Sequence, residues 1–325
     1  MNSNYAKGVL FCLIATLSWG AMFPVMTSAL TRMDPFTFTS MRYGIAGVAF
    51  LIMLVVKEGW VGLSMKGERT FLAWVLGTAG FVGFGFLVFL GQKLAGPDGA
   101  LTASIMMATM PMLGILVNWA IRKVVPPIVS ILFIFVSFSG VVTVITKGDL
   151  FSLFQHPQNY GADALIILGA LCWVIYTVGA SLFPKWSPYK YTAITTTLGM
   201  TSVLTLNFLL YLGGVVPIPS IGDFVFVIPH VLYMAFIAGF VGVLCWNFGN
   251  KILTPTNGTL FMDVVPITAF IISAILGIIP TEAQVVGACI TGAALILNNL
   301  YMRKRMISSA VPSQHISASL QPVRN

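Results

Sequence analysis

The segment TLFMDVVPITAF, residues 259–270, places the ionisable Asp263 and the helix-breaking Pro266 within an apolar run. From Asn257 onward the run reads as the start of a helix that crosses a membrane. A charge in the bilayer core costs about 2.5–3.5 kcal/mol, so such residues usually face a cavity or a partner. Because Pro266 has no amide hydrogen, we expect the carbonyl of Met262 to lose its helical partner beside the carboxylate. The pair predicts polar groups inside the membrane that a substrate or a proton can use.

Asp263 is therefore the candidate for both substrate binding and proton coupling. It is the only one of the nine carboxylates that lies well within an apolar run. Counted from Asn257 at 1.5 Å per residue, it lies ~9 Å inside the cytoplasmic edge of its span. The alternative is an aspartate that hydrogen-bonds to neighbouring helices and serves assembly alone.

The composition extends the membrane assignment to the whole chain. Of its 325 residues 58% are hydrophobic and 8% are charged, and the mean hydropathy is +0.94. A soluble domain carries about 25% charged residues. The apolar residues come in runs of about 20, the length that crosses a ~30 Å bilayer core, and ~10-residue alternating strands are not visible. The predicted fold class is an all-α integral membrane protein. Ten runs are predicted to span the membrane, at roughly 8–29, 36–56, 71–91, 100–121, 128–146, 162–183, 191–212, 229–249, 257–279 and 283–301.

The distribution of Lys and Arg predicts the orientation. With a cytoplasmic N-terminus, the inside segments hold 13 of the 17 basic residues and the outside loops hold Arg32, Lys93 and Lys147. Basic residues favour the cytoplasmic side of a membrane. Both termini are therefore predicted to be cytoplasmic, and the net charge of +8 lies in short loops rather than on a nucleic-acid surface.

Two pairs of motifs recur at nearly one offset along the chain. Trp19 of SWGAMFP aligns with Trp173 of CWVIYTV, and Pro111 of SIMMATMP aligns with Pro266 of TLFMDVVP. The chain is therefore predicted to consist of two five-helix halves, residues 1–150 and 151–305, followed by a disordered cytoplasmic tail, 306–325. Because five is odd, the halves insert with opposite orientation. Inverted repeats are typical of transporters whose substrate site lies between the halves and which work by alternating access.

The chain resembles EamA-type members of the drug/metabolite transporter superfamily. The resemblance rests on Trp19-Gly20 and Phe23 in the first span, Arg42 in the second, the paired Pro111 and Pro266, and PTEAQVVGACITGAALIL at 280–297. It covers about residues 8–302. It implies a ten-helix secondary transporter, often an exporter of amino acids or other small metabolites.

Two features depart from that family's pattern. The usual Gly-Glu pairs are absent: IRKVVPP (121–127) replaces the first, and Ile278 follows Gly277 in the second. The acid that often precedes the ninth-span proline is Val265 here, and Asp263 lies three residues before Pro266. The substrate and the coupling ion are therefore not carried over from any relative.

Arg42 is the other charge well inside a span, ~9 Å from the outer edge at 1.5 Å per residue. It is interpreted as structural or as snorkelling to the outer surface, with contact to a substrate carboxylate as the alternative. The aromatic residues Trp19, Phe23, Trp173, Tyr176 and Trp246 also lie within spans.

The repeat-related Trp19 and Trp173 could form an aromatic box for an apolar or cationic solute, or serve helix packing alone. Asn247, next to Trp246, is a further binding candidate. Pro24, Pro111 and Pro266 are candidates for helix breaks and gating.

The motifs exclude several other functions. There is no HExxH or GxSxG motif of a membrane enzyme and no GxxxxGK[ST] loop of an ATP-driven pump. We therefore predict a non-enzymatic secondary transporter of amino acids or hydrophobic or aromatic metabolites, with a gradient-independent facilitator or channel as the alternative. The expected partners are a small-molecule substrate, the lipid bilayer and protons, with a homodimer left open and no nucleic acid, metal or cofactor. The predicted location is the bacterial cytoplasmic membrane.

Overall fold

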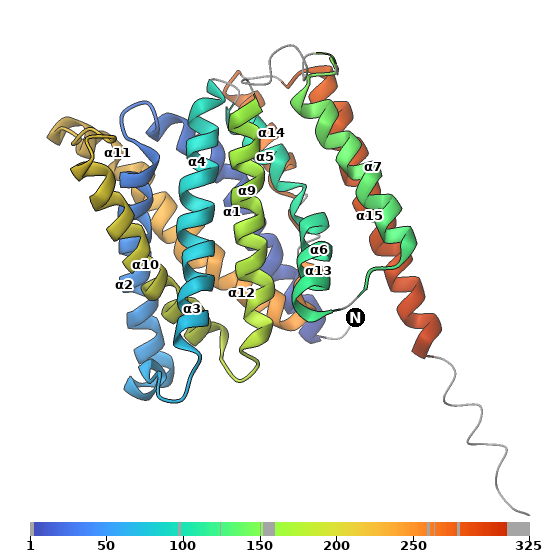
Figure 1. Ribbon diagram of the computed structural model, residues 1–325, viewed down its shortest axis with the longest axis horizontal. Helices are drawn as coiled ribbons and strands as arrows, with labels where there is room; N and C mark the ends of the chain where they lie inside the picture. The colour runs from blue at the N-terminus through green and yellow to red at the C-terminus, as the bar shows by residue number, and fades with distance from the viewer. Residues whose placement is uncertain are drawn as a thin grey trace, which may run out of the picture.

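The computed structural model describes residues 3–96, 99–123, 125–149, 151, 160–258, 261–262, 264–277 and 280–310. Within these ranges every regular element is a helix, which confirms the all-α class (Figure 1). The α-helices are α1 (Ser3–Ala29), α2 (Pro35–Glu58), α3 (Thr70–Gly77), α4 (Phe84–Leu94), α5 (Gly99–Met107), α6 (Met110–Arg122), α7 (Ile128–Ile145), α9 (Gly161–Gly179), α10 (Pro188–Leu212), α11 (Ile221–Leu232), α12 (Val243–Leu253), α13 (Pro255–Gly258), α14 (Val264–Ile275) and α15 (Glu282–Ala310). Short 3₁₀ turns are η1 (Trp60–Leu63) and η5 (Ala180–Leu182), and π-helical segments are η2 (Thr78–Gly83) and η6 (Tyr233–Gly242).

Not all of the ten predicted spans are equally long. In the described part of the chain, seven helices are long and apolar enough to cross a membrane, or eight if the bent pair α5 and α6 forms one span. The ninth and tenth predicted spans correspond to α14 and to Glu282–Asn298 of α15, which are shorter apolar helices. The count of ten and the side of the membrane that holds the termini stay predictions.

The first helix of each part of the chain packs against helices of the other part. α1 packs on η6, α12 and α14, and in the same way α9 packs on η2, α4, α5 and α6. α2 pairs with α10, and α7 pairs with α15 at one edge of the bundle (Figure 1). The π-helical segments η2 and η6 occupy equivalent places in these two groups of contacts.

In the fourth and ninth predicted spans, a proline lies within the first three residues of the helices α6 and α14. α5 and α6 meet at a 42° bend, and Pro111 is the second residue of α6. Pro266 is the third residue of α14. Proline is tolerated there because the first amides of a helix have no helical partner in any case.

The expectation for the Met262 carbonyl stays a prediction, because Asp263, between Met262 and α14, lies outside the described residues. Pro24 lies within α1, which continues to Ala29, so the helix does not end at this proline. The gating role of all three prolines stays a prediction.

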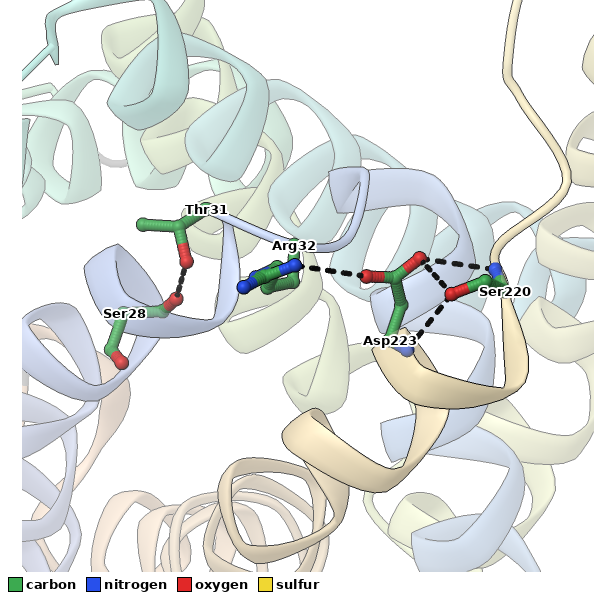
Figure 2. Close-up of polar contacts among 5 residues, drawn as sticks. All are labelled: Ser28, Thr31, Arg32, Ser220 and Asp223. Carbon is green, nitrogen blue, oxygen red and sulfur yellow. Dashed lines mark hydrogen bonds and ion pairs between the residues drawn. The ribbon is translucent and has the colours of Figure 1, made fainter.

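Two helix ends also differ from the predicted boundaries. The predicted span 229–249 belongs to a helix that begins at Ile221, because Ser220 and Asp223 form a capping box at its start. Figure 2 shows this cap, in which Asp223 also approaches Arg32 of the α1–α2 loop at 4.0 Å. α15 continues to Ala310, so residues 306–310 of the predicted tail are helical. The first helix breaker after this point is Pro312.

Polar and apolar side chains are distributed as a lipid environment requires. On α2 the apolar Val48, Ile52 and Val56 are exposed, whereas Thr39 and Arg42 are buried. Several pairs of helices lie in close backbone contact at glycine residues. A Cβ added to Gly77 of α3 would lie 2.0 Å from the carbonyl oxygen of Thr195 on α10. Close backbone contact of this kind is typical of packing between membrane helices.

Candidate substrate cavity

A closed cavity lies in the middle of the bundle. Its volume is about 10 Å³, which is room for about one water. The side chains around it come from α1, α2, α4, α5, α9, α12, the 261–262 segment and α14. They are Trp19, Met22, Phe23, Arg42, Tyr43, Phe84, Met107, Trp173, Val243, Met262 and Val265.

Repeat-related residues meet in this cavity. The indole rings of Trp19 and Trp173 are in contact, with centroids 5.3 Å apart. Met107 and Met262, which the alignment of SIMMATMP with TLFMDVVP places opposite each other, both line the wall. The structure thus brings the predicted Trp19, Phe23, Arg42 and Trp173 to one site.

Arg42 lies inside the bundle rather than reaching the outer surface. The residue is 1% exposed, and its guanidinium lies over the rings of Tyr43 and Phe89, 4.3 and 5.3 Å from the ring centroids. Its Nη1 donates to the Met22 sulfur at 3.6 Å, the guanidinium also interacts with the Tyr43 side chain, and its Nε has no partner among the described residues. Outward snorkelling is therefore wrong for this conformation.

Tyr176, Trp246 and Asn247 lie behind the cavity rather than in its wall. Asn247 Nδ2 donates to the Tyr176 hydroxyl at 2.8 Å and to Thr192 Oγ1 at 2.7 Å. Trp246 Nε1 donates to Thr177 Oγ1 at 2.9 Å. The Tyr176 ring in turn contacts the Trp173 ring, with centroids 5.0 Å apart. These three predicted residues form a hydrogen-bonded partition between α9, α10 and α12.

A larger, open vestibule lies beyond this partition, at the ends of α6, α9 and α12 and the start of α10. Here about 260 Å³ can hold the centre of a water molecule. Asn247 and Tyr191 line it on the side of the partition, and Arg122 and Lys251 add two basic side chains. This end of the bundle is the one that the Lys and Arg distribution predicts to be cytoplasmic.

Asp263, the leading candidate from the sequence, lies outside the described residues, between the cavity-lining Met262 and α14. Its roles in binding and proton coupling stay predictions. No group of three or more His, Cys, Asp or Glu side chains suited to a metal occurs within the described ranges.

Sequence reasoning missed Tyr43, Met22 and Phe84 in the cavity, and Gln92 beside it. Gln92 is 2% exposed and donates through Nε2 to the Phe23 carbonyl at 2.8 Å. An amide within an apolar run was a signal that could have found Gln92. Nothing in the local sequence distinguishes Tyr43 or Phe84 from other aromatic residues in the spans.

Comparison with known proteins identifies similar chains. A model of the EamA-like transporter family matches residues 6–146 and again 161–300. A Bacillus subtilis (strain 168) protein named uncharacterized transporter YrdR is 38% identical over 297 residues, covering 91% of this chain and 92% of its own. A second from the same organism, uncharacterized transporter YyaM, is 30% identical over 271 residues, covering 83% and 86%. A solved structure described as "Crystal structure of protein" has a TM-score of 0.65 at 17% identity, covering 91% of this chain and 98% of its own, which is a likeness of fold.

Proposed function

Because the chain belongs to the EamA-like transporter family, we propose that it is a secondary transporter that exports small organic solutes by alternating access. The proposed solutes are amino acids or other hydrophobic or aromatic metabolites, and the proposed location is the bacterial cytoplasmic membrane. The two family matches and the exchanged helix contacts support two inverted five-helix halves. The names of the relatives favour transport over enzymatic activity.

The observation that carries this proposal is the closed cavity between repeat-related side chains. Alternating access requires a substrate site near the midplane that is reached from one side at a time. The cavity is lined by Trp19 and Met107 on one part of the chain and by Trp173 and Met262 on the other. A tilt of one half against the other would separate these pairs and enlarge the cavity. A permanently open channel has no need for a partition such as the one that Tyr176, Trp246 and Asn247 form between the cavity and the vestibule.

The lining supports an apolar or aromatic solute. Apart from Arg42, the described residues of the wall are aromatic residues, methionines and valines. Methionine side chains are flexible and polarisable, so they adapt to solutes of different shapes. A facilitator that uses only the gradient of its solute is the alternative, and it differs in lacking a coupling ion.

Uptake into proteoliposomes tests the function. A panel of labelled aromatic and branched-chain amino acids would be measured with and without an imposed pH gradient, for wild type and Asp263→Asn. Accumulation driven by the gradient, lost in the variant while exchange is kept, is the expected result for a proton-coupled transporter. Uptake that is the same with and without the pH gradient in both proteins would establish a facilitator. Failure of every solute to move, with folded protein in the liposomes, would contradict transport of this solute class.

A further inference from the structure

We propose that the solute carries a carboxylate, and that Arg42, Tyr43 and Trp173 together bind it within the cavity. This inference rests on the proposed transport function and specifies the head group of the solute. It is drawn from polar atoms that lie in an apolar enclosure without partners.

The guanidinium of Arg42 is the first of these groups. A guanidinium has five N–H donors and stays charged in proteins. Among the described residues, Arg42 contacts the weak sulfur acceptor of Met22 and the neutral Tyr43 but no carboxylate, and the ion pairs found there involve Arg32 and Lys190 instead. A buried charge without hydrogen bonds is costly, so a site of this kind is completed by an anion.

Two neighbouring donors point to the same ligand. The Tyr43 hydroxyl and the Trp173 indole Nε1 are buried and have no hydrogen-bond partner of normal geometry in the part of the chain that the structure describes. Both residues line the cavity together with Arg42, and they come from α2 and α9. These donors from Arg42, Tyr43 and Trp173 could all be met by one acceptor group, and a carboxylate offers two oxygens that match the guanidinium fork.

The single positive charge among the described lining residues favours a carboxylate over a phosphate. Among the described residues that line the cavity, Arg42 is the one cationic side chain and the others are neutral. A phosphate monoester carries up to two negative charges at neutral pH and three acceptor oxygens. The rings of Trp19, Phe23 and Phe84 would contact the apolar body of the same solute.

The vestibule gives anions a route from the predicted cytoplasmic side. Arg122 and Lys251 line it, and Lys251 Nζ donates to the Trp186 carbonyl at 2.6 Å. Clefts lined by one sign of charge raise the local concentration of opposite ions. A carboxylate would meet these residues before it reaches the partition of Asn247 and Tyr176.

Binding of three matched probes tests the inference. The probes are 3-phenylpropanoate, 3-phenylpropan-1-ol and 3-phenylpropan-1-amine, which share one apolar body and differ in the head group. Binding to the purified full-length protein would be measured by calorimetry and by fluorescence of the tryptophans. We expect the carboxylate to bind at least about 10-fold more tightly than the alcohol or the amine, because a charged hydrogen-bonded pair contributes about 1.5–3 kcal/mol. Equal or tighter binding of the amine, or no binding of the carboxylate, would overturn the inference.

Variants identify the residues responsible. Arg42→Gln should abolish the preference for the carboxylate while weak binding of the alcohol remains, and Arg42→Lys should keep part of it. Arg32→Gln is the matched control, because it removes an exposed arginine outside the cavity. Tyr43→Phe and Trp173→Phe should each reduce carboxylate affinity several-fold. Persistence of the preference in Arg42→Gln would overturn the assignment.

A further variant separates a solute carboxylate from the chain's own. If Asp263 supplied the anion for Arg42, Asp263→Asn would be required before the probe could bind. We expect wild type to bind the carboxylate without that change. If the wild-type protein does not bind 3-phenylpropanoate and the Asp263→Asn variant does, the inference is contradicted. Proteoliposomes that transport the amine or the alcohol would leave the transport function standing without a carboxylate.

Discussion

The indole rings of Trp19 and Trp173 meet edge to face, with centroids 5.3 Å apart and planes at 89°. Their hydrogen bonding differs. Trp19 Nε1 donates to the Ala238 carbonyl in η6 at 2.9 Å, whereas Trp173 Nε1 has no partner among the residues that the structure describes. Equivalent positions of the predicted repeat therefore carry the same residue in two roles: one fastens α1 to η6, and the other leaves a donor free at the cavity.

This difference predicts unequal effects of two matched substitutions. Both Trp19→Phe and Trp173→Phe remove ring area from the same cluster, but only the first breaks a hydrogen bond. Trp19→Phe should be less stable than Trp173→Phe by about 0.5–1 kcal/mol, the usual net contribution of one such bond. Thermal unfolding in detergent, followed by fluorescence, would measure the order. A lower melting temperature for Trp173→Phe would contradict the two roles.

The partition behind the cavity predicts a change in access from the vestibule. Asn247→Ala removes both hydrogen bonds that hold Tyr176 and Thr192 together. In a background without native cysteines, Met107→Cys should then react several-fold faster with an impermeant maleimide added on the vestibule side.

Asn207→Ala is the matched control for this experiment. Asn207 is also a buried asparagine on a membrane helix, but it lies on α10 and does not line the cavity or the vestibule. Its labelling rate should equal that of the parent. Equal rates for both variants would show that the Asn247 partition does not limit access.

The contact of α3 with α10 predicts a severe effect from one methyl group. A Cβ at Gly77 would lie 2.0 Å from the Thr195 oxygen and 3.0 Å from the Gly199 nitrogen, which are backbone atoms that cannot turn away. Gly77→Ala should destabilise the protein by about 3 kcal/mol, the upper end of the usual cost of overpacking.

The control is Gly292→Ala on α15, where an added Cβ meets nothing within 4 Å. Replacing glycine by alanine within an open helix stabilises by up to about 1 kcal/mol. Size-exclusion chromatography and thermal unfolding would compare the two. A folded Gly77→Ala protein with the stability of wild type would contradict the observed close packing.

The predicted orientation can be tested with two exposed lysines at opposite ends of the bundle. Lys66 lies in the α2–α3 connection and Lys93 at the end of α4. In intact cells, Lys93→Cys should react with an impermeant maleimide, whereas Lys66→Cys should react only after the membrane is opened. The reverse pattern would place the termini outside.

The sequence was most informative where one residue is unusual for its surroundings. A tryptophan or arginine within an apolar run is rare enough to predict a functional region, and Trp19, Trp173 and Arg42 do share one cavity. Tyr43 could not be selected in this way because aromatic residues are common along the spans. The bend between α5 and α6 beside Pro111 was also hidden, because a proline that starts a helix and one that interrupts it look alike in sequence.

The amino-acid sequence by itself determined that this chain is a helical membrane protein with recurring motifs, since hydropathy and motif spacing are local properties. Only the tertiary structure decided which residues meet. Trp19 and Trp173 come together because α1 and α9 pack against exchanged partners, and Asn247 reaches Tyr176 because α12 lies beside α9 and α10. Contacts of this kind depend on the angles and the depth at which helices cross. Those quantities are set by close packing of small residues such as Gly77 and Gly199, which no single segment of the sequence specifies.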